Sequence, residues 1–224
     1  MKSNPLLLSA LALAALLNTT SLSAATNPAT IVSSTVSASN SLRVNTESST
    51  MTWTAKKVGG EHTGTIKLAD GALEVKGNKL TGGNFTIDMT TIVDTDITRP
   101  ESNKRLTDHL KSDDFFSVEK HPTSTFRITK VVPKAKAKAG EANYTITGNL
   151  TIKGITNSIT FPATVKIAGK TAEATALIEV DRTKYDIKYR SGLVGTAADK
   201  IIYDTFTIDL KLMAGVTNES VGSR

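Results

Sequence analysis

The sequence predicts an all-β fold, an antiparallel eight-stranded barrel with a short helical insertion near residues 100–111. Polar and apolar residues alternate one by one through most of residues 49–213, which is the period of half-buried strands. Glycine-containing turn signals separate these stretches at the spacing of hairpins. One face of nearly every stretch is apolar and the other is rich in Thr and Lys, so the apolar face is expected to point inward. Closing such a sheet into a barrel removes its exposed edges.

The two ends of the chain are expected to lie outside the barrel. Lys2, the apolar run 6–17 and the small residues 23–25 predict a signal peptide over residues 1–25. The apolar run is shorter than the roughly 20 residues that a bilayer-spanning helix needs, and the alternative is a retained amphipathic anchor. We expect residues 26–47 to be a Ser/Thr-rich linker, 48–214 the barrel and 215–224 a flexible tail.

Compartment and charge narrow the classes of function. The 224 residues include no cysteine, which excludes disulfides, thiol nucleophiles and the acylated cysteine of a lipoprotein. We therefore expect a soluble periplasmic protein that is not a lipoprotein. The net charge of +6 could favour an anionic ligand or transient contact with a membrane surface, whereas nucleic acid is not expected in that compartment. The lysines of residues 133–140 are interpreted as a solvated hairpin loop, with a functional basic patch as the alternative.

Four strands are expected before the insertion, at residues 51–56, 62–68, 72–75 and 83–89. The dipeptide Asp70-Gly71 predicts a tight turn between the second and the third, and Gly82-Gly83 predicts a bulge or bend. The side chains expected to point inward are those of Met51, Trp53, Ala55, His62, Gly64, Ile66, Leu68, Phe85, Ile87 and Met89.

The insertion interrupts the alternation. Leu106 and Leu110 are four residues apart and would lie on one side of a short helix. Thr98 and Glu101 have the spacing of a capping box, and proline at position 100 suits a first helical turn. Phe115 and Phe116 follow. We expect this segment to lie over or beside the barrel opening.

After the insertion, the alternation resumes at residues 124–129, 144–153, 155–164, 171–180 and 201–212. Pro162 predicts a sheet edge or a bulge, because proline cannot donate to a ladder. The side chains expected to point inward include Ser124, Phe126, Ile128, Tyr144, Ile146, Leu150, Ile152, Ile159, Phe161, Ala174, Ala176, Ile178, Val180, Phe206, Ile208, Leu210 and Leu212.

The barrel interior is expected to be apolar and incompletely filled. Several inward residues are Ala or Gly, and only 5% of the chain is aromatic. This favours a cavity for one small ligand over the alternative of a flattened, close-packed barrel. By parity His62 and Arg182 could point inward and contact a polar head group. The alternatives are a rim position for His62 and a turn at Arg182.

No catalytic or metal-binding motif is found. His62, His109 and His121, with the carboxylates at 113, 114 and 119, are the metal-ligand types considered, and their spacings match no ligand motif. The chain contains neither G-x-S-x-G nor a phosphate-binding glycine loop. We therefore expect no metal, no cofactor and no enzymatic activity.

Four segments carry a resemblance to a known family. They are residues 60–64 (GEHTG), 106–122 (LTDHLKSDDFFSVEKHP), 148–154 (GNLTIKG) and 181–185 (DRTKY). On these residues the chain resembles the YceI-like family of exported polyisoprenoid-binding proteins, from about residue 49 to residue 213. The resemblance implies a lipocalin-like barrel with a long apolar pore that holds isoprenoid or fatty lipids, with no catalytic residues and no metal.

These observations together predict a lipid-binding carrier for a polyisoprenoid of polyprenyl or quinone type, or for a fatty chain. The alternative is an envelope stress or interaction protein in which the lipid is only structural, and a homodimer stays open. The residues expected to contact the ligand are Trp53, His62, Ile66, Phe85, Ile87, Met89, Leu106, Leu110, Phe115, Phe116, Phe126, Ile128, Ile146, Ala174, Ala176, Ile178, Arg182, Phe206 and Ile208.

Overall fold

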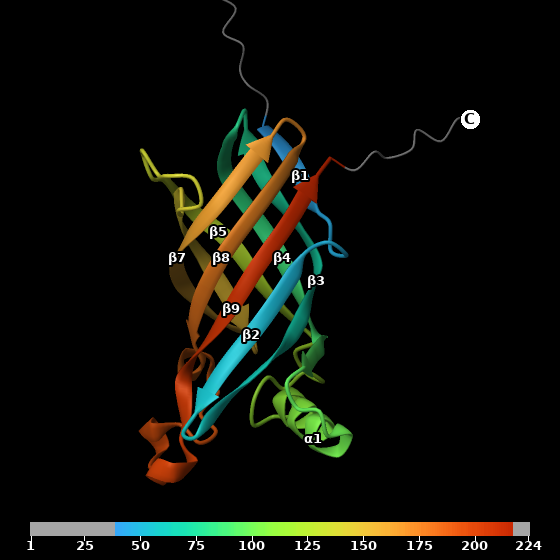
Figure 1. Cartoon of the computed structure of the whole chain (residues 1–224), viewed down its shortest axis with the longest axis vertical. Helices are drawn as coiled ribbons and strands as arrows, with labels where there is room; N and C mark the ends of the chain where they lie inside the picture. Colours follow the sequence, from blue (N-terminus) through green and yellow to red (C-terminus); the bar gives the residue numbers. More distant parts are fainter. Residues whose placement is uncertain (1–38, 217–224) are drawn as a thin grey trace, which may run out of the picture. The chain divides into compact units, whose positions relative to one another are not determined.

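The computed structural model describes residues 39–216 as nine strands, one α-helix and three short 3₁₀ helices (Figure 1). The predicted signal peptide, residues 26–38 of the predicted linker and residues 217–224 of the predicted tail lie outside this part of the chain. The elements are β1 (Ser39–Val44), β2 (Thr50–Lys57), β3 (Gly60–Lys76), β4 (Lys79–Asp94), α1 (Pro100–Lys111), β5 (Thr123–Pro133), β6 (Tyr144–Ile152), β7 (Ile155–Ala168), β8 (Thr171–Asp181), η1 (Arg182–Tyr185), η2 (Gly192–Val194), η3 (Ala198–Lys200) and β9 (Ile202–Gly215).

The nine strands form a closed antiparallel barrel that is eight strands around, because two short strands occupy one place in the ring. This confirms the predicted fold. Neighbouring strands follow the order β1-β3-β2-β9-β8-β7-β6-β5-β4, and pairing between β3 and β4 closes the ring. β1 and β2 share one position, because both lie between β3 and β9. β2 pairs with residues 60–66 of β3, and β1 pairs with residues 72–76 of the same strand.

The barrel begins earlier than predicted. Residues 39–44 form β1, so the prediction of a flexible linker that extends to residue 47 is wrong for this stretch. Leu42 pairs with Leu73 of β3 and is buried in the core. The segment contains too few apolar residues for periodicity to reveal a strand, and pairing with β3 and β9 decides its conformation.

The predicted tight turn at Asp70-Gly71 is also wrong, because β3 runs straight through it. Leu68 pairs with Ile87 and Asp70 with Thr86, so Ala69 is the extra residue of a β-bulge. The bulge shifts the alternation by one, and the inward positions then become 71, 73 and 75. Glycine at position 71 allows β3 to pack closely on Phe85, because a Cβ atom there would lie 2.7 Å from the Phe85 ring. The turn comes instead after Lys76, where Gly77 has a φ of 58°.

The helix spans the predicted residues, but its start differs from the prediction. Arg99 is the N-cap and no side chain caps the helix, so the Thr98–Glu101 capping box is not formed. Leu110 is buried and Leu106 is half-buried, as expected for one face packed on the barrel. No helix in residues 39–216 is both long enough and apolar enough to cross a bilayer.

A second segment lies at the same end of the barrel as α1. Residues 182–201 connect β8 to β9 through η1, η2 and η3, and Figure 1 shows them at the lower end beside α1. Tyr185, Ile187 and Ser191 of this segment are fully buried. The connection has no simple period, so sequence patterning could not predict its buried positions.

The ladder between β7 and β8 is incomplete. It joins residues 164–168 to residues 171–175, and β8 continues beyond it paired with β9 alone. Pro162 lies where β7 pairs with β6 on one side and has no ladder to β8 on the other, which confirms the predicted edge position.

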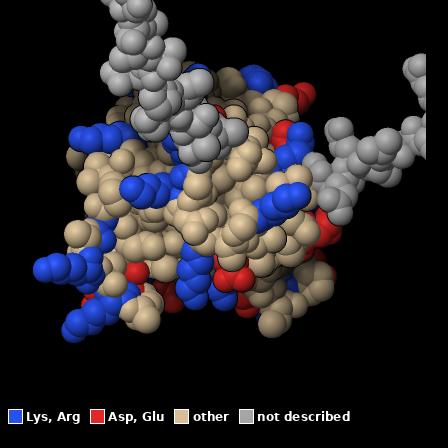
Figure 2. Space-filling model, turned by 90° about the horizontal axis from the view of Figure 1, so that it is seen from above, with Lys and Arg blue, Asp and Glu red and all other residues tan. Residues whose placement is uncertain are grey.

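The opposite end of the barrel carries dispersed charges. Figure 2 shows this end, where Lys and Arg side chains project around the outline with uncharged surface between them. Lys134, Lys136 and Lys138 are exposed in the connection between β5 and β6, as expected for a solvated loop.

Candidate functional site: an apolar pore

Two adjoining cavities lie inside the barrel. Their volumes are about 120 Å³ and about 110 Å³. Five side chains, each from a different strand, contribute to the walls of both cavities. They are Met51, Ile87, Leu150, Val180 and Ile208. The cavities therefore adjoin at this ring of side chains, and together they are called the pore, each cavity being one half of it. The interior is thus not filled by side chains, which resolves the alternative of a close-packed barrel in favour of a cavity.

The wall of the pore is almost entirely apolar. The half near α1 is lined by Leu110, Phe115 and Phe116 of the insertion and by Ile187 of the β8–β9 connection. The polar residues that line this half are Ser124, Arg182 and Tyr203, and Thr175 lines the other half. The Ser124 hydroxyl is buried without a hydrogen-bond partner, whereas the other wall positions offer mostly hydrocarbon.

The structure gathers nearly all residues predicted to contact a ligand. Those that line the pore are Trp53, Ile66, Phe85, Ile87, Met89, Leu110, Phe115, Phe116, Phe126, Ile128, Ile146, Ala174, Ala176, Ile178, Arg182, Phe206 and Ile208. His62 and Leu106 line neither half, contrary to the prediction. Leu106 packs against the core from α1, and His62 contacts two aspartates at the rim.

Arg182 lies in the pore wall, but its guanidinium is already fully paired. Nε donates to the carbonyl of Tyr203 at 3.0 Å, and Nη1 donates to those of Ile187 at 2.8 Å and Tyr189 at 3.0 Å. Nη2 donates to Ile202 at 2.8 Å and contacts Asp204 Oδ1 at 3.4 Å. Burial lowers the pKa of Arg182, and Asp204 and Asp181 oppose this effect. With its five N–H groups used, the side chain has no donor left for a ligand head group.

The insertion and the β8–β9 connection meet through aromatic rings. The His109 ring lies 4.9 Å from the Phe115 ring and 4.7 Å from the Tyr189 ring, in both cases edge to face. His109 Nε2 also contacts Asp114 Oδ2 at 2.9 Å. This cluster joins the two segments at the α1 end, where Phe115 closes one side of the pore.

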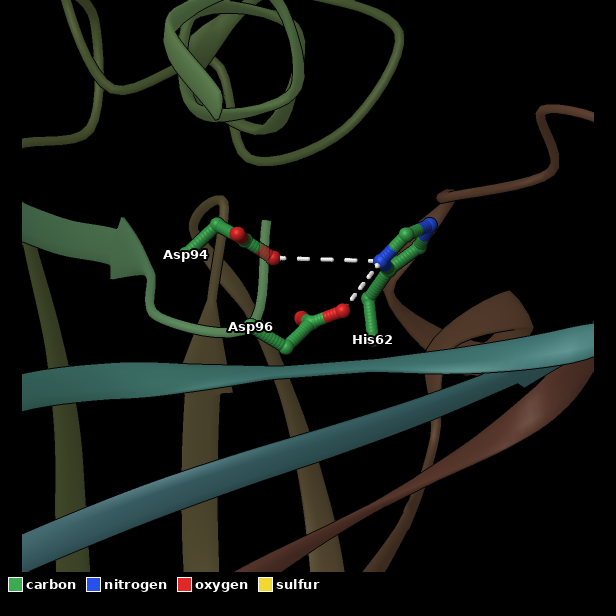
Figure 3. A group of neighbouring side chains, drawn as sticks. All are labelled: His62, Asp94 and Asp96. Atoms are coloured by element: carbon green, nitrogen blue, oxygen red, sulfur yellow. Dashed lines mark hydrogen bonds and ion pairs between the residues drawn. The ribbon is translucent and has the colours of Figure 1, made fainter. Parts of the chain in front are cut away.

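A polar centre lies at the rim between β3 and the start of the insertion (Figure 3). His62 Nδ1 is 3.0 Å from Asp96 Oδ2 and 3.9 Å from Asp94 Oδ2. Burial raises the pKa of Asp94, an effect that the N–H of Ile97 opposes and that neighbouring Asp96 reinforces. Burial would also raise the pKa of Asp96, but the hydrogen bond from the N–H of Thr63, the neighbouring Asp94 carboxyl and the contact with His62 outweigh it and lower that pKa.

Sequence reasoning missed two members of this centre and a smaller part of the pore wall. Gly64 pairs with Asp94 across β3 and β4, which brings residues 94 and 96 close to His62 although some thirty positions separate them in the sequence. An Asp-x-Asp pair directly after a strand was the available signal. Strand alternation placed twelve further pore residues inward without assigning them a ligand contact, namely Met51, Ala55, Leu68, Ser124, Leu150, Ile152, Ile159, Phe161, Ala163, Val180, Leu210 and Leu212. The pore residues that it did not place inward are Leu73, Leu80, Ile92, Val165, Thr175, Ile187, Ile202 and Tyr203.

These features define a closed antiparallel barrel with an internal apolar pore and a helical segment at one mouth. Barrels of this size can hold one small ligand. The chain belongs to the YceI-like family, because the YceI-like domain model matches residues 42–214, nearly the whole described part.

The chain is also similar to individual bacterial proteins. A Vibrio campbellii protein named UPF0312 protein is 37% identical over 94 residues, which cover 39% of this chain and 47% of that protein. A Pseudomonas aeruginosa protein of the same name is 47% identical over 55 residues, 25% of this chain and 26% of that protein. The matched stretches thus span about half of these relatives or less.

Two solved structures share the fold. Burkholderia cenocepacia BcnA is 24% identical with a TM-score of 0.59, and the match covers 76% of this chain and 99% of that one. A polyisoprenoid binding domain from Saccharophagus degradans, implicated in plant cell wall breakdown, is 15% identical with a TM-score of 0.56. That match covers 79% of this chain and 98% of that one.

Proposed function

We propose that the protein binds a polyisoprenoid of polyprenyl or quinone type, or a fatty chain, in the barrel pore and carries it through the periplasm. The observation that carries the proposal is the pore itself, two adjoining cavities with an almost wholly apolar wall. Such a wall can bury a hydrocarbon chain, whereas it offers a polar molecule few hydrogen-bonding groups. The fold similarity to a polyisoprenoid binding domain supports this ligand class.

The cavity volumes limit how much of a ligand each half of the pore encloses. An apolar cavity of about 150 Å³ accommodates one benzene-sized ring, and each half of the pore is of that order. Burial contributes about 0.8 kcal/mol per CH₂, so one five-carbon isoprene unit contributes roughly 3–4 kcal/mol. Several units are needed to exceed an association cost of about 4–15 kcal/mol. We therefore expect chain length to dominate affinity.

Ser124 is the residue best placed to contact a polar atom of the ligand. Its hydroxyl is buried, unpaired and in the pore wall, in contrast to the fully paired Arg182. A buried hydroxyl without a partner is unfavourable, and a ligand oxygen could supply the missing hydrogen bond. A carbonyl or hydroxyl head group would then lie in the half of the pore near α1.

The β8–β9 connection provides a surface for collecting a lipid from a membrane. Leu193 and Val194 of η2 are 73% and 54% exposed, and Lys188, Arg190 and Lys200 accompany them in the same connection, where Lys188 is paired with Asp186 and Lys200 with Asp199. Exposed apolar side chains among cations match an anionic bilayer surface, where the cations contact head groups and the apolar residues enter the interface. This segment also lines the pore through Ile187, so contact would place the pore beside the source of the ligand.

The proposal is tested by native mass spectrometry of the protein purified from its own periplasm, followed by organic extraction. A polyprenyl, quinone or acyl species at one per chain is the expected result. Transfer of that species between vesicles would support a carrier, because a lipid that is only structural would stay bound. A protein that carries no lipid and takes up none from vesicles would overturn the proposal.

A further inference from the structure

The rim centre has the composition of a metal site. Among the described residues, His62, Asp94 and Asp96 are the one group of three potential ligands whose donor atoms all lie within 4.8 Å of one another. The N···O distances of 3.0 and 3.9 Å suit ligands that share an ion at about 2.0–2.2 Å from each atom. His62 comes from β3, and the two aspartates come from the end of β4 and the connection to α1.

An unpartnered atom points into this centre. The Asp94 side chain is 0% exposed, and its Oδ2 accepts no hydrogen bond from any described residue. Figure 3 shows this oxygen directed toward the His62 ring, on the same side as Asp96. A buried carboxylate oxygen without a donor is unfavourable, and a cation is the ligand that would satisfy it.

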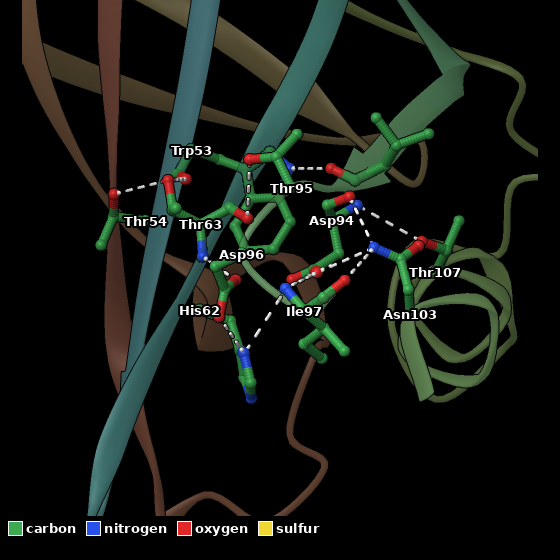
Figure 4. A network of polar contacts seen from close by, with 11 residues as sticks. Trp53, Thr54, His62, Thr63, Asp94, Thr95, Asp96, Ile97, Asn103 and Thr107 are labelled. Atoms are coloured by element: carbon green, nitrogen blue, oxygen red, sulfur yellow. Dashed lines mark hydrogen bonds and ion pairs between the residues drawn. The ribbon is translucent and has the colours of Figure 1, made fainter. Parts of the chain in front are cut away.

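The surrounding hydrogen bonds orient both carboxylates (Figure 4). Asp94 Oδ1 accepts from the N–H of Ile97 at 2.9 Å and from Asn103 Nδ2 at 3.1 Å. Asp96 Oδ1 accepts from the N–H of Thr63 at 2.8 Å. In each carboxylate one oxygen is therefore held by the protein while the other faces His62. Outer hydrogen bonds of this kind fix the ligands of metal sites.

We propose that His62 Nδ1, Asp94 Oδ2 and Asp96 Oδ2 bind one divalent transition-metal ion, which fastens the β4–α1 connection to β3 beside the pore. One imidazole and two carboxylates suit zinc or manganese better than calcium, which takes six to eight oxygen ligands. Three protein ligands leave a coordination position for water. Asp96 and His62 are 34% and 25% exposed, so the ion has a route from solvent. The proposal does not depend on the lipid.

Zinc is the probe. The untagged protein is stripped with a chelator, dialysed and titrated calorimetrically with zinc chloride and, separately, with magnesium chloride. We expect one zinc ion per chain, and a melting temperature higher by about 5–10 °C when free zinc is 100 times its dissociation constant. Magnesium at the same concentration should leave the melting temperature unchanged. Failure of zinc to bind at one per chain would overturn the proposal.

Two variants locate the ion. Asp94→Asn keeps Oδ1 as acceptor for Ile97 and Asn103 but replaces the free oxygen. We expect its zinc affinity to be at least about 100-fold lower, and its melting temperature not to rise when zinc is added. His62→Gln should have the same effect. The matched control is Asp114→Asn, which removes the same charge from the separate contact with His109 and should leave zinc binding unchanged. Zinc binding of wild-type strength in both Asp94→Asn and His62→Gln would place the ion elsewhere and refute the assignment.

Discussion

Arg182 and Asp94 are both buried charged residues near the α1 end of the barrel, but their polar atoms are satisfied to different degrees. Arg182 directs its N–H groups to four backbone carbonyls and Asp204, all within the β8–β9 connection and the first residues of β9. Asp94 has one oxygen bonded to the β4–α1 segment and one oxygen without any partner.

The difference separates a structural charge from the proposed metal ligand. A buried cation whose donors are all used fixes the chain around it and has no capacity for a further ligand. A buried anion with an unused oxygen, placed beside an imidazole and a second carboxylate, retains that capacity. Burial is common to both residues, so the number of satisfied polar atoms, and not burial, distinguishes them.

The largest expected effect comes from removal of the Arg182 charge. Arg182→Met leaves four carbonyls of the β8–β9 region without their donor, and we expect the free energy of unfolding to fall by about 3–5 kcal/mol. Denaturant unfolding measures it. Lys at this position restores the charge but not the planar set of donors, so it should recover only part of the loss. A decrease below about 1 kcal/mol for Arg182→Met would refute the structural role.

The next largest loss of stability is expected at Gly64 of β3, which lies close to the Val93 carbonyl beside the rim centre. A Cβ atom at Gly64 would overlap the Val93 carbonyl and lie 2.5 Å from the Trp53 ring, so Gly64→Ala must separate β3 from β4. We expect a loss of about 1–3 kcal/mol in the free energy of unfolding and weaker zinc binding. Gly60→Ala is the matched control, because its Cβ meets only Lys57 Cε at 3.9 Å. Equal stability of the two variants would contradict the close approach.

In metal-free protein, Asp94→Asn should raise the free energy of unfolding, whereas the two preceding substitutions should lower it. The variant removes a buried carboxylate oxygen without a partner, so we expect a stability gain of about 1–3 kcal/mol at neutral pH. The pKa of Asp94 is raised in the folded state, so the folded protein binds more protons than the unfolded chain above the ordinary value of 3.8. Wild-type stability relative to Asp94→Asn should therefore fall as pH rises from that value through the folded-state pKa. Unfolding curves from pH 3 to 8 would detect the trend, and a relative rise would contradict it.

The smallest effect concerns the ligand. Ser124→Ala removes the unpaired hydroxyl of the pore wall, so affinity for a lipid with a carbonyl or hydroxyl head group should fall by about 5- to 10-fold. Affinity for a plain hydrocarbon of the same length should not fall. Competition with a fluorescent lipid measures both, and an equal decrease for both ligands would indicate that Ser124 acts only through packing.

Sequence alternation predicted strands well where no bulge intervenes. In β6 the inward positions Tyr144, Ile146, Leu150 and Ile152 are all buried as expected. The prediction failed at Ala69, since one extra residue reverses every later side chain of β3. It also missed β1, whose strand conformation depends on its partners.

The candidate sites were predictable to different extents. Pore residues such as Ile87 and Ile208 follow from strand parity, so most of the apolar wall could be anticipated. The rim centre could not, because the register of β3 against β4 brings His62 to the aspartates. Ile187 lies in an irregular connection, where periodicity carries no information.

The central claim is that a lipid occupies the pore, and paired tryptophan variants of β8 test it most directly. Ala174 points into the pore, whereas Leu177 on the same strand is 64% exposed. Uptake of a polyprenyl lipid from vesicles should fall at least about 10-fold in Ala174→Trp and stay unchanged in Leu177→Trp, with thermal denaturation confirming that both fold. If Ala174→Trp does not fold, Ala176→Phe replaces it. Undiminished uptake by a folded pore variant would contradict the account.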